Sequence, residues 1–369
     1  MTISAAETSW PDVLSRLTSS RDLDAGSAAW AMTSILTGDA TSAQMAAFVA
    51  ALRTKGETPE EVDALVSVML QHARLLDLGP NAPDVVLDVV GTGGDQAHTV
   101  NISTMTALVC AAAGVPVVKH GNRAASSSTG TADVLEELGV VIDLEPEAVA
   151  ASVRQAGIGF CFAPVHHPAM RFAGPTRREL GFPTVFNILG PLTNPAGAKA
   201  ALIGAASLAL APVMADVLSR RGVRALVVRG EDGLDEISTS GATRIWDATS
   251  GAVDEVLIDV NDVGIEPADP QLLRGGDRSR NAELLRKALA ATCDSMDEDV
   301  TRVTAIRDAV ALNAAAALVA YDAAMGLPVD QPLAERIRGR LVGARDVLDS
   351  GAALASLDRW IDVTVALRR

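Results

Sequence analysis

The sequence is poor in cysteine and in positive charge, and both shortages narrow the choice of function. Its three cysteines are odd in number and widely spaced, and none resembles a zinc-binding pair. Acidic residues outnumber basic ones by 46 to 31, which gives a formal net charge of −15. A protein that lives on nucleic acid or on an anionic membrane normally has a basic surface, so the charge speaks against both classes. An acidic chain that binds phosphates must gather its cations locally or use a metal.

Long apolar runs of the kind that cross or enter membranes are also missing. The first ten residues have no basic segment and no apolar segment of a secretory signal. The most apolar late stretch, Ala309 to Tyr321, is short and contains Asn313, so we expect a buried helix there. Cys110 and Cys161 lie inside apolar runs and are expected in the core. We expect a globular, cytoplasmic protein.

What the sequence does contain is a change of pattern near residue 80. Residues 1–78 predict four helices, the last starting at Thr58 with Pro59 at its first position. A Pro- and Gly-rich run, 78–83, marks the boundary to a second domain, 84–369. Strands are expected near 85–90, 115–119, 158–162, 201–205 and 224–229, with helices such as 131–138 and 146–156 between them. This alternation predicts an α/β fold with a mainly parallel sheet flanked by helices.

Two later regions depart from this alternation. A polar, Pro-rich stretch, Ala163 to Pro195, interrupts it, and we expect this stretch to cross back to the helical domain. Residues 300–369 read as helices again.

A Gly-rich turn, Gly91 to Asp95, follows the first strand of the second domain and precedes a helix that starts near Asn101. Glycines let a backbone approach an anion closely, and free amides at a helix start point at the charge. Ser103 and Thr104 add hydroxyl groups at the same place. The other interpretation is a tight turn that needs glycine for its positive φ angles.

A second polar turn, Lys119 to Arg123, follows the next strand. Lys119 supplies a point charge and Arg123 a planar fork for an oxyanion. The run 124–131 then offers small hydrogen-bond donors before a helix, although it also fits a solvated loop. Two such turns at the carboxyl ends of neighbouring strands suggest a ligand with two anionic ends.

Acidic and basic side chains in two other segments complete the candidate set. Asp235 and Glu236 follow a strand, where carboxylates opposite phosphate-binding loops suggest Mg²⁺, although acidic turns are common. Arg177 or Arg178 either grips a carboxylate or belongs to a solvated helix face. Adjacent histidines at 166 and 167 do not have the spacing of a zinc site.

Several motifs in order carry a family resemblance: Gly91–Asp95, Asn101–Thr104, Lys119–Arg123, Pro164 with His167-Pro168, Pro183–Asn187 with Gly190–Pro195, and Gly233–Glu236. Together they closely resemble the anthranilate phosphoribosyltransferases, which act in the tryptophan branch of aromatic amino acid biosynthesis. The resemblance covers nearly the whole chain. It implies a Mg²⁺-dependent homodimer with a helical dimerisation domain, 1–78, joined by a return segment around 170–195. A large domain, 84–369, would hold phosphoribosyl pyrophosphate in a hinge cleft.

The resemblance also implies roles for individual residues. Phosphoribosyl pyrophosphate would contact Gly91, Gly94, Asp95, Thr99, Asn101, Ile102, Ser103, Thr104, Lys119, His120, Gly121, Asn122, Arg123, Ala124, Ala125, Ser126, Ser127 and Thr131. Anthranilate would contact Gly91, Asn122, Pro164, His167 and Arg177, and two Mg²⁺ ions would be served by Ser103, Asp235 and Glu236. The chain departs from the family in two places: Met170 stands where some members have Tyr, and Thr131 where Ser is frequent.

The implied reaction needs positioning and electrostatics more than proton transfer. Pyrophosphate leaves the ribose, and the aromatic amine of anthranilate, neutral at pH 7, attacks the anomeric carbon without a strong base. A pyrimidine-nucleoside phosphorylase-like enzyme is the nearest alternative, and it should lack the two acids at 235–236 and use inorganic phosphate. A non-enzymatic, nucleic-acid-binding relative is the other, and the net charge of −15 speaks against it.

Overall fold

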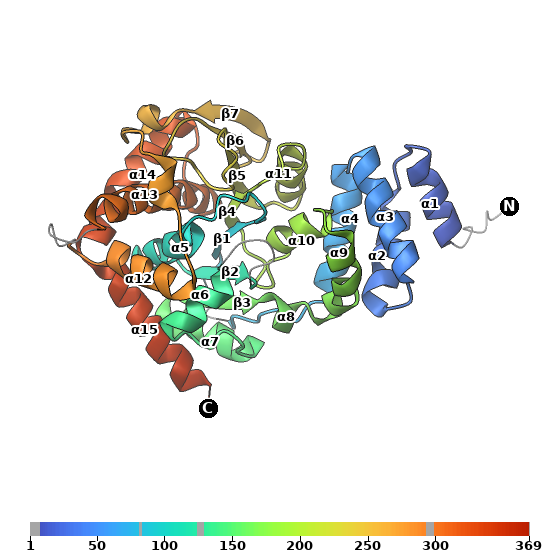
Figure 1. Cartoon of the computed structure of the whole chain (residues 1–369), viewed down its shortest axis with the longest axis horizontal. Helices are drawn as coiled ribbons and strands as arrows, with labels where there is room; N and C mark the ends of the chain where they lie inside the picture. The colour runs from blue at the N-terminus through green and yellow to red at the C-terminus, as the bar shows by residue number, and fades with distance from the viewer. Residues whose placement is uncertain (1–7, 81–82, 124–128, 293–298, 369) are drawn as a thin grey trace.

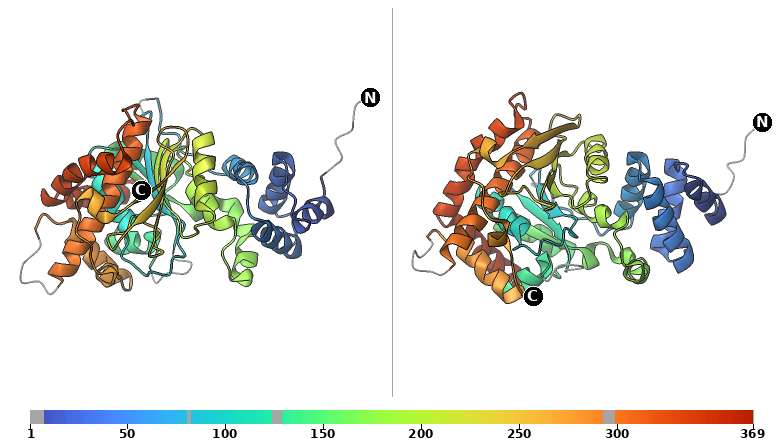
Figure 2. Two further views of the ribbon diagram at one scale, coloured as in Figure 1. Left: turned by 90° about the horizontal axis from the view of Figure 1, so that it is seen from above. Right: turned by 45° about the horizontal axis from the view of Figure 1, so that its top comes forward.

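The computed structural model describes residues 8–80, 83–123, 129–292 and 299–368. The predicted fold class is confirmed: a group of N-terminal helices lies at one end, and a mainly parallel sheet with helices on its faces forms the rest (Figure 1). The green segment from α8 to α10 lies beside the N-terminal helices in all three views (Figures 1 and 2). The protein therefore has two lobes that are joined by more than one stretch of chain.

The N-terminal lobe consists of four short helices, each begun by a capping side chain. They are α1 Trp10–Thr18, α2 Ala25–Thr37, α3 Ser42–Lys55 and α4 Pro59–Gln71. Thr58 caps α4 as predicted, and Glu61 completes a capping box with it. Glu61 is fully buried, and it also accepts from the Leu23 amide and pairs with Lys55. This polar cluster fixes the ends of α3 and α4 against the loop before α2.

The sheet has seven strands in the order β3-β2-β1-β4-β5-β6-β7. Their bounds are β1 Leu87–Gly91, β2 Val117–Gly121, β3 Ile158–Phe162, β4 Ala200–Gly204, β5 Arg224–Gly230, β6 Thr243–Asp247 and β7 Asp254–Ile258. The first five strands run parallel, whereas β6 and β7 add to one edge in antiparallel fashion. Gly91 and Gly204 pair at the carboxyl ends of β1 and β4. The two predicted phosphate-type turns follow β1 and β2, so both begin at that end of the sheet.

Helices cover both faces of the sheet and bury it in two large cores. Those of the large lobe are α5 Ile102–Ala112, α6 Thr131–Leu138, α7 Pro146–Ala156, α11 Ala211–Arg220, α12 Arg278–Leu289, α13 Val300–Ala324, α14 Leu333–Asp349 and α15 Ala352–Leu367, with short 3-10 turns η2 Val260–Val263 and η3 Pro270–Leu273. Leu87, Val89 and Leu202 face the core formed with α5 and α13. Val90 and Ile203 face the core that continues into the N-terminal lobe. Because neighbouring strand residues point to opposite faces, β1 and β4 join the two cores.

The irregular stretch after β3 packs on the N-terminal helices. It forms α8 Ala163–His166, the 3-10 turn η1 Pro168–Phe172, α9 Gly174–Leu180 and α10 Phe186–Leu192. Helix α9 contacts α3, η1 contacts α2 and α10 contacts α4. Arg53 of α3 donates to the Pro183 carbonyl and lies over the Phe182 ring, which ties the loop after α9 to the N-terminal lobe.

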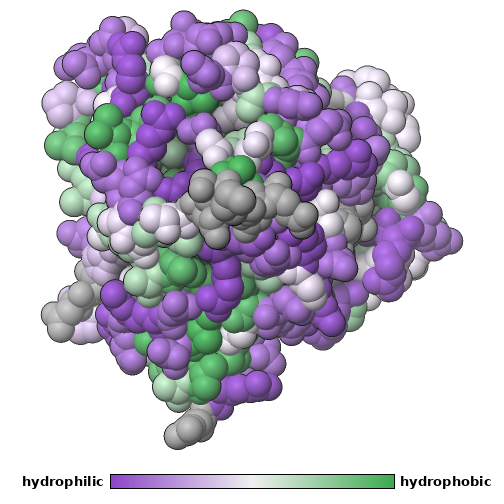
Figure 3. All heavy atoms as spheres, turned by 60° about the vertical axis from the view of Figure 1, so that its left-hand side comes forward, coloured by the Kyte–Doolittle hydropathy of each residue, from purple (hydrophilic) through white to green (hydrophobic). Residues whose placement is uncertain are grey.

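Helix α13 is the most apolar long helix of the described residues. By length and composition it could cross a membrane, but 83% of its most apolar window is buried inside the protein. It packs on α14, α5, β4 and β5. The expectation of a buried helix around Ala309 to Tyr321 is confirmed, and so is the burial of Cys110 and Cys161. In Figure 3, polar residues dominate the face in view, and apolar residues form small separate groups between them.

Candidate active site

The Gly-rich turn after β1 closes on the acidic segment that follows β5. Gly93 and Gly94 have positive φ angles of 64° and 89°, as the tight-turn interpretation requires. The Gly93 amide donates to Oδ2 of Asp235 at 2.8 Å. Asp95 also approaches this segment, since its carboxylate lies 3.5 Å from the Asp235 amide. The turn and the acids, 142 residues apart in sequence, therefore form one structure.

Glu236 is buried and Asp235 is half-buried, and the two carboxylates have too little positive charge around them. Glu236 is only 8% exposed, and burial raises its pKa to about 8, against the opposing effect of Lys119. Burial also raises the pKa of Asp235 well above its usual range, and the nearby Asp95 and Glu236 raise it further. Buried carboxylates in this state gain from a cation that arrives with the ligand.

Lys119 lies beneath the turn, with its side chain 1% exposed. Its ammonium donates to Oγ of Ser103 at 3.1 Å and to the carbonyl of Val89. Burial lowers the pKa of Lys119, while Asp88, Glu236 and Asp235 act in the opposite direction. The lysine therefore holds the Ser103 hydroxyl in place and partly balances the acidic pair.

Two glycines leave the space that the acidic segment fills. A Cβ atom at Gly204 would lie 1.6 Å from the carbonyl oxygen of Asp235, and one at Gly91 would lie 2.6 Å from its Oδ2. The predicted set contains Gly91 but not Gly204. Gly204 stands at the end of an ordinary strand. This position requires glycine because a segment further along the chain packs against it, and no local sequence pattern reveals that contact.

The second predicted turn is only partly an open anion site. The guanidinium of Arg123 forms ion pairs with Asp133 and Glu136 of α6 and lies 5.6 Å from the centre of the Phe162 ring. It therefore already has partners in the protein. Asn122 accepts from the amides of Arg123 and Ala132. The predicted residues Ala124, Ala125, Ser126 and Ser127 lie outside the described residues.

His120 and His167 connect the second turn to the segment after α9. Nδ1 of His120 donates to the Gly190 carbonyl at 2.8 Å, and Nε2 of His167 donates to the Thr193 carbonyl at 3.1 Å. The two ring centroids are 5.1 Å apart. Burial lowers the pKa of His120 to about 3 and that of His167 to about 4, so both are neutral at pH 7. The neighbouring His166 instead bonds to the Arg74 carbonyl.

Arg177 of α9 is a guanidinium without a counterion. Among the described residues it has no hydrogen bond or ion pair, and it lies 5.7 Å over the Phe186 ring. It is half-buried, and this burial lowers its pKa. Arg178, next to it, is exposed. The solvated-face interpretation therefore fits Arg178 and not Arg177.

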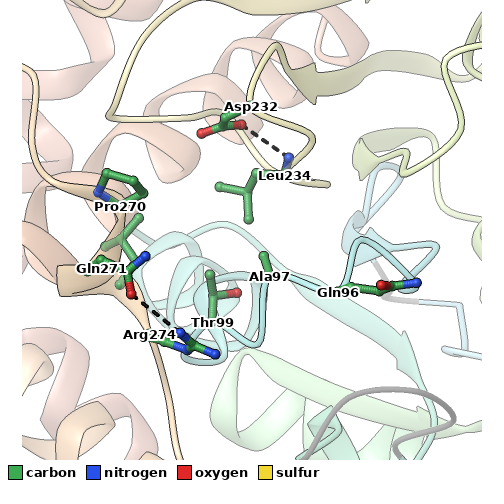
Figure 4. Close-up of a pocket in the computed structure, with 9 residues that line it drawn as sticks. Gln96, Ala97, Thr99, Asp232, Leu234, Pro270, Gln271 and Arg274 are labelled. Atoms are coloured by element: carbon green, nitrogen blue, oxygen red, sulfur yellow. Dashed lines mark hydrogen bonds between the residues drawn. The ribbon is translucent and has the colours of Figure 1, made fainter.

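The loop that leads into α5 is supported by a segment that the sequence motifs did not mark. Asn281 is 1% exposed; its Nδ2 donates to Oδ1 of Asn101, and its Oδ1 accepts from the Gly276 amide. Arg274 forms a β-bridge with Thr99. A pocket of about 320 Å³ lies here, with Gln96, Ala97 and Thr99 on one side, Asp232 and Leu234 on another, and Pro270, Gln271 and Arg274 opposite (Figure 4). Its walls come from three separate loops, which explains why no single motif marks it.

The oxygen atoms of the acidic pair and of Ser103 suit a hard divalent cation, but they do not form a complete metal site by themselves. The part of the chain that the structure describes has no group of three or more His, Cys, Asp or Glu side chains arranged to hold a metal. Asp235, Glu236 and the Ser103 hydroxyl supply oxygen atoms only. Mg²⁺ is usually held by one or two carboxylates, waters and substrate phosphates, so a pair of buried carboxylates fits it.

Family comparisons match both lobes of the chain. A family described as "Glycosyl transferase family, helical bundle domain" matches residues 11–73. A second, described as "Glycosyl transferase family, a/b domain", matches residues 83–354.

Whole-length relatives agree with these matches. The chain is 54% identical to the anthranilate phosphoribosyltransferase of Salinispora arenicola, over 98% of each chain. It is 51% identical to that of Nocardia farcinica, over 96% of this chain and 99% of the relative. The crystal structure of the Thermus thermophilus enzyme aligns with a TM-score of 0.85 at 38% identity, over 97% of this chain and 100% of the other. A Saccharomyces cerevisiae enzyme in complex with phosphoribosyl pyrophosphate and Mg aligns at 0.83 and 26% identity, over 98% and 99%.

Proposed function

The chain belongs to the anthranilate phosphoribosyltransferase family, and from this we propose how its site works. It transfers the phosphoribosyl group of phosphoribosyl pyrophosphate to the amine of anthranilate, giving N-(5-phosphoribosyl)anthranilate and pyrophosphate. The observation that carries the proposal is the acidic pair, half-buried Asp235 and buried Glu236, packed against the Gly-rich turn. Lys119 balances this pair only in part, and metal ions that arrive with the diphosphate would supply the remaining positive charge.

The phosphoribosyl pyrophosphate end lies along the start of α5 and the second turn. Residues 91–95 approach the diphosphate with their backbone, and the amides at the start of α5 face it. Asn101 is positioned for this role by Asn281, and Ser103 by Lys119. Thr131 begins α6 and presents its hydroxyl at another helix start.

Mg²⁺ is the metal that this donor set would hold, with Ser103, Asp235 and Glu236 as ligands and two ions in each subunit. A structural relative was solved with phosphoribosyl pyrophosphate and Mg together. When bound, the metal stabilises the negative charge that grows on the leaving diphosphate. The Gly93 amide holds the Asp235 carboxylate and Lys119 holds the Ser103 hydroxyl, so both groups are in place before the ligand arrives.

Anthranilate binds at the other end, where Arg177 grips its carboxylate. A relative from Saccharomyces cerevisiae was solved with 4-fluoroanthranilate. Asn122, Pro164, His167 and Gly91 complete the aromatic site. The guanidinium of Arg177 has no other partner among the described residues, so it is available for a two-point contact.

Proton transfer by a side chain is a minor part of the mechanism. Neutral His120 and His167, with pKa values lowered to about 3 and 4, are weak bases, and their donor nitrogens are occupied. The amine of anthranilate is already neutral and carries its own lone pair. The chain contributes by holding amine and ribose carbon in line and by excluding water.

Anthranilate fluorescence provides the test. Mixing the protein with phosphoribosyl pyrophosphate, Mg²⁺ and anthranilate should remove the fluorescence of anthranilate. Omission of Mg²⁺ should stop the loss. Turnover of a pyrimidine nucleoside with inorganic phosphate, and no loss of anthranilate fluorescence, would favour the phosphorylase-like alternative.

We also propose that the helical domain, 1–78 with the return segment 170–195, forms a homodimer interface. Trp30 and Leu14 are only partly buried at the surface of the helical core, and Phe172 and Phe182 are exposed on the return segment at 36% and 39%. A helical layer of this size gains stability by packing against a second subunit. Sedimentation should show a dimer, whereas a single 38.1 kDa species at micromolar concentration would refute it.

A further inference from the structure

Helix α13 carries one polar side chain in its buried stripe, Asn313. The other buried residues of this helix are Ala, Val, Leu and Ile. Asn313 is 0% exposed and packs among these apolar neighbours. An amide buried in such a place costs stability unless its donors and acceptor are all used, so its partners show what it is for.

The Asn313 amide grips one residue of the acidic segment from both sides. Its Oδ1 accepts from the Ile237 amide at 3.0 Å, and its Nδ2 donates to the Ile237 carbonyl at 3.1 Å. The second Nδ2 hydrogen goes to the Ala309 carbonyl one turn earlier in α13, at 2.9 Å. The side chain therefore acts toward Ile237 as a neighbouring strand would.

Ile237 directly follows the acidic pair on a segment without regular structure. Between the end of β5 and the start of β6 the backbone forms neither helix nor strand, so it has no ladder of hydrogen bonds to fix it. The carbonyl of Asp235 rests against Gly204, on one side of the segment. Asn313 holds the backbone two residues later, from α13. Together with the hydrogen bond from the Gly93 amide to Asp235, these two contacts set how Asp235 and Glu236 lie relative to the Gly-rich turn.

We propose that Asn313 is a positioning residue for the carboxylates of Asp235 and Glu236, and so for the metal-bound diphosphate. This inference rests on the proposed function. Asn313 touches no substrate; it acts through the backbone of Ile237. A shift of about 1 Å in a positioned group can cost about 100-fold in rate, which sets the scale of its effect.

Two variants separate positioning from simple support of the core. Asn313→Leu has a similar volume and removes all three hydrogen bonds. Asn313→Asp, kept protonated by its apolar surroundings, can repeat both bonds to Ile237 and lose only the bond to Ala309. Controls are Ser152→Ala, which removes a buried bond to the Ile158 carbonyl, and Val303→Ala, which opens a cavity in α13 far from Ile237.

The first measurement follows backbone hydrogen exchange in the free protein, without metal or substrate. Peptides covering residues 232–240 should exchange faster in Asn313→Leu, little faster in Asn313→Asp, and at the wild-type rate in both controls. Unchanged exchange in Asn313→Leu would show that the grip on Ile237 does not hold the segment, and would overturn the proposal.

The second measurement is steady-state kinetics with Mg²⁺, phosphoribosyl pyrophosphate and anthranilate varied in turn. Asn313→Leu should lower kcat/KM for phosphoribosyl pyrophosphate about 10–100-fold and raise the Mg²⁺ concentration needed for half-maximal rate, with the anthranilate KM unchanged. Asn313→Asp should recover most of the loss, and it decides the question if Asn313→Leu does not fold. An inactive wild type would refute the proposed function itself. If the wild type is active and the Asn313 variants need the same Mg²⁺ concentration as the wild type, only the positioning role would be refuted.

Discussion

The two ends of the site are built in opposite ways. At the end proposed for phosphoribosyl pyrophosphate, Asp235 and Glu236 lie against the glycines that end β1 and β4, with Lys119 nearby. At the end proposed for anthranilate, Arg177 projects from the seven-residue helix α9, which packs on the N-terminal lobe. The first end has surplus negative charge, and the second has a positive charge with no ion-pair partner among the described residues.

Under the proposed function, this difference sets how each end recognises its ligand. The acidic end packs closely against Gly91 and Gly204, and it would be completed by cations that accompany the diphosphate. The cationic end would be completed by the carboxylate of the aromatic substrate, and its position depends on how the two lobes meet. Changes at one end should therefore leave binding at the other almost untouched, and the following experiments test that independence.

The largest effect is expected for the acidic end. Replacing both Asp235 and Glu236 by Ala should lower kcat/KM by roughly 10²–10³-fold, the scale for losing an electrostatic stabiliser. The melting temperature should hold or rise, because buried carboxylates with raised pKa values do not favour the fold. Glu231→Ala, an exposed acid of the same loop, is the control and should keep full activity. Near-wild-type activity of the double variant would show that Asp235 and Glu236 do not hold the metal.

The cationic end comes next. Arg177→Ala should raise KM for anthranilate about 10–150-fold, the equivalent of about 1.5–3 kcal/mol for a charged hydrogen bond. KM for phosphoribosyl pyrophosphate should change little. Arg177→Lys should recover only part of the loss, because an ammonium cannot make the planar two-point contact. Arg178→Ala is the matched control on the same helix. If only the phosphoribosyl pyrophosphate KM rose, Arg177 would belong to the other end.

Gly204→Ala tests the rigidity of the acidic end. The added methyl group would meet the Asp235 carbonyl, and such overpacking costs about 1–3 kcal/mol. Thermal unfolding should occur at a lower temperature, and the enzyme should need more Mg²⁺, with an unchanged anthranilate KM. Gly241→Ala has open space around it and should do neither. An equal effect on the anthranilate KM would show that the two ends are coupled.

The smallest effect concerns Asp88, which is buried on β1. Burial raises its pKa to about 6, against the opposing effects of Asn194, of Lys119 and of the His120 amide, which donates to its Oδ1 at 3.1 Å. Between pH 4 and pH 6 the unfolded chain loses this proton and the folded protein keeps it. Stability therefore falls as the pH rises, by at most about 3 kcal/mol, and the loss is complete above pH 6.

Asp88→Asn removes this loss, since an amide needs no proton. Its free energy of unfolding should exceed that of the wild type by about 1–2 kcal/mol at pH 8 and approach it at pH 4, because weaker hydrogen bonds of the amide offset part of the gain. Denaturant titrations at the two pH values provide the measurement. Asp84→Asn, exposed just before the same strand, is the control. An equal gain at both pH values would mean that ionisation of Asp88 is not the cause.

Local patterns were sufficient for most of the sheet and for the helices beside it. The expected helices 131–138 and 146–156 match α6 and α7, and the strand expected at 158–162 matches β3. These elements have strong signals of their own, such as Pro146 at a helix start and the glycines that end α6 and α7. The antiparallel strands β6 and β7 were missed. The exposed edge strand β7 lacks the apolar run of a buried strand, and the interior strand β6 is buried but carries Arg244 and Asp247 among its five residues.

The site was harder to predict where its geometry depends on distant contacts. Three of its contacts join parts of the chain that are far apart in sequence. They are the packing of the acidic segment on Gly204, the hydrogen bond from Asn281 to Asn101, and the hydrogen bonds between Asn313 and Ile237. Arg123 shows a different limit. Its residue type predicts an anion contact, which stays a prediction, and the pairing of Arg123 with two acids of α6 could not be read from the motif. A motif thus predicts which groups are present more reliably than which of them are free.

The hydrogen bonds between Ile237 and Asn313 span 76 residues and tie the acidic segment to a helix near the end of the chain. On a ribosome, all seven strands would emerge long before α13. A growing chain could therefore form its sheet while the acids at 235–236 still lacked their anchor. The same helix covers an apolar face of the sheet, so a chain cut short before residue 300 would expose that face to aggregation. The catalytic centre can thus be completed only after α13 has been made, and chains terminated before residue 300 should be inactive and readily degraded.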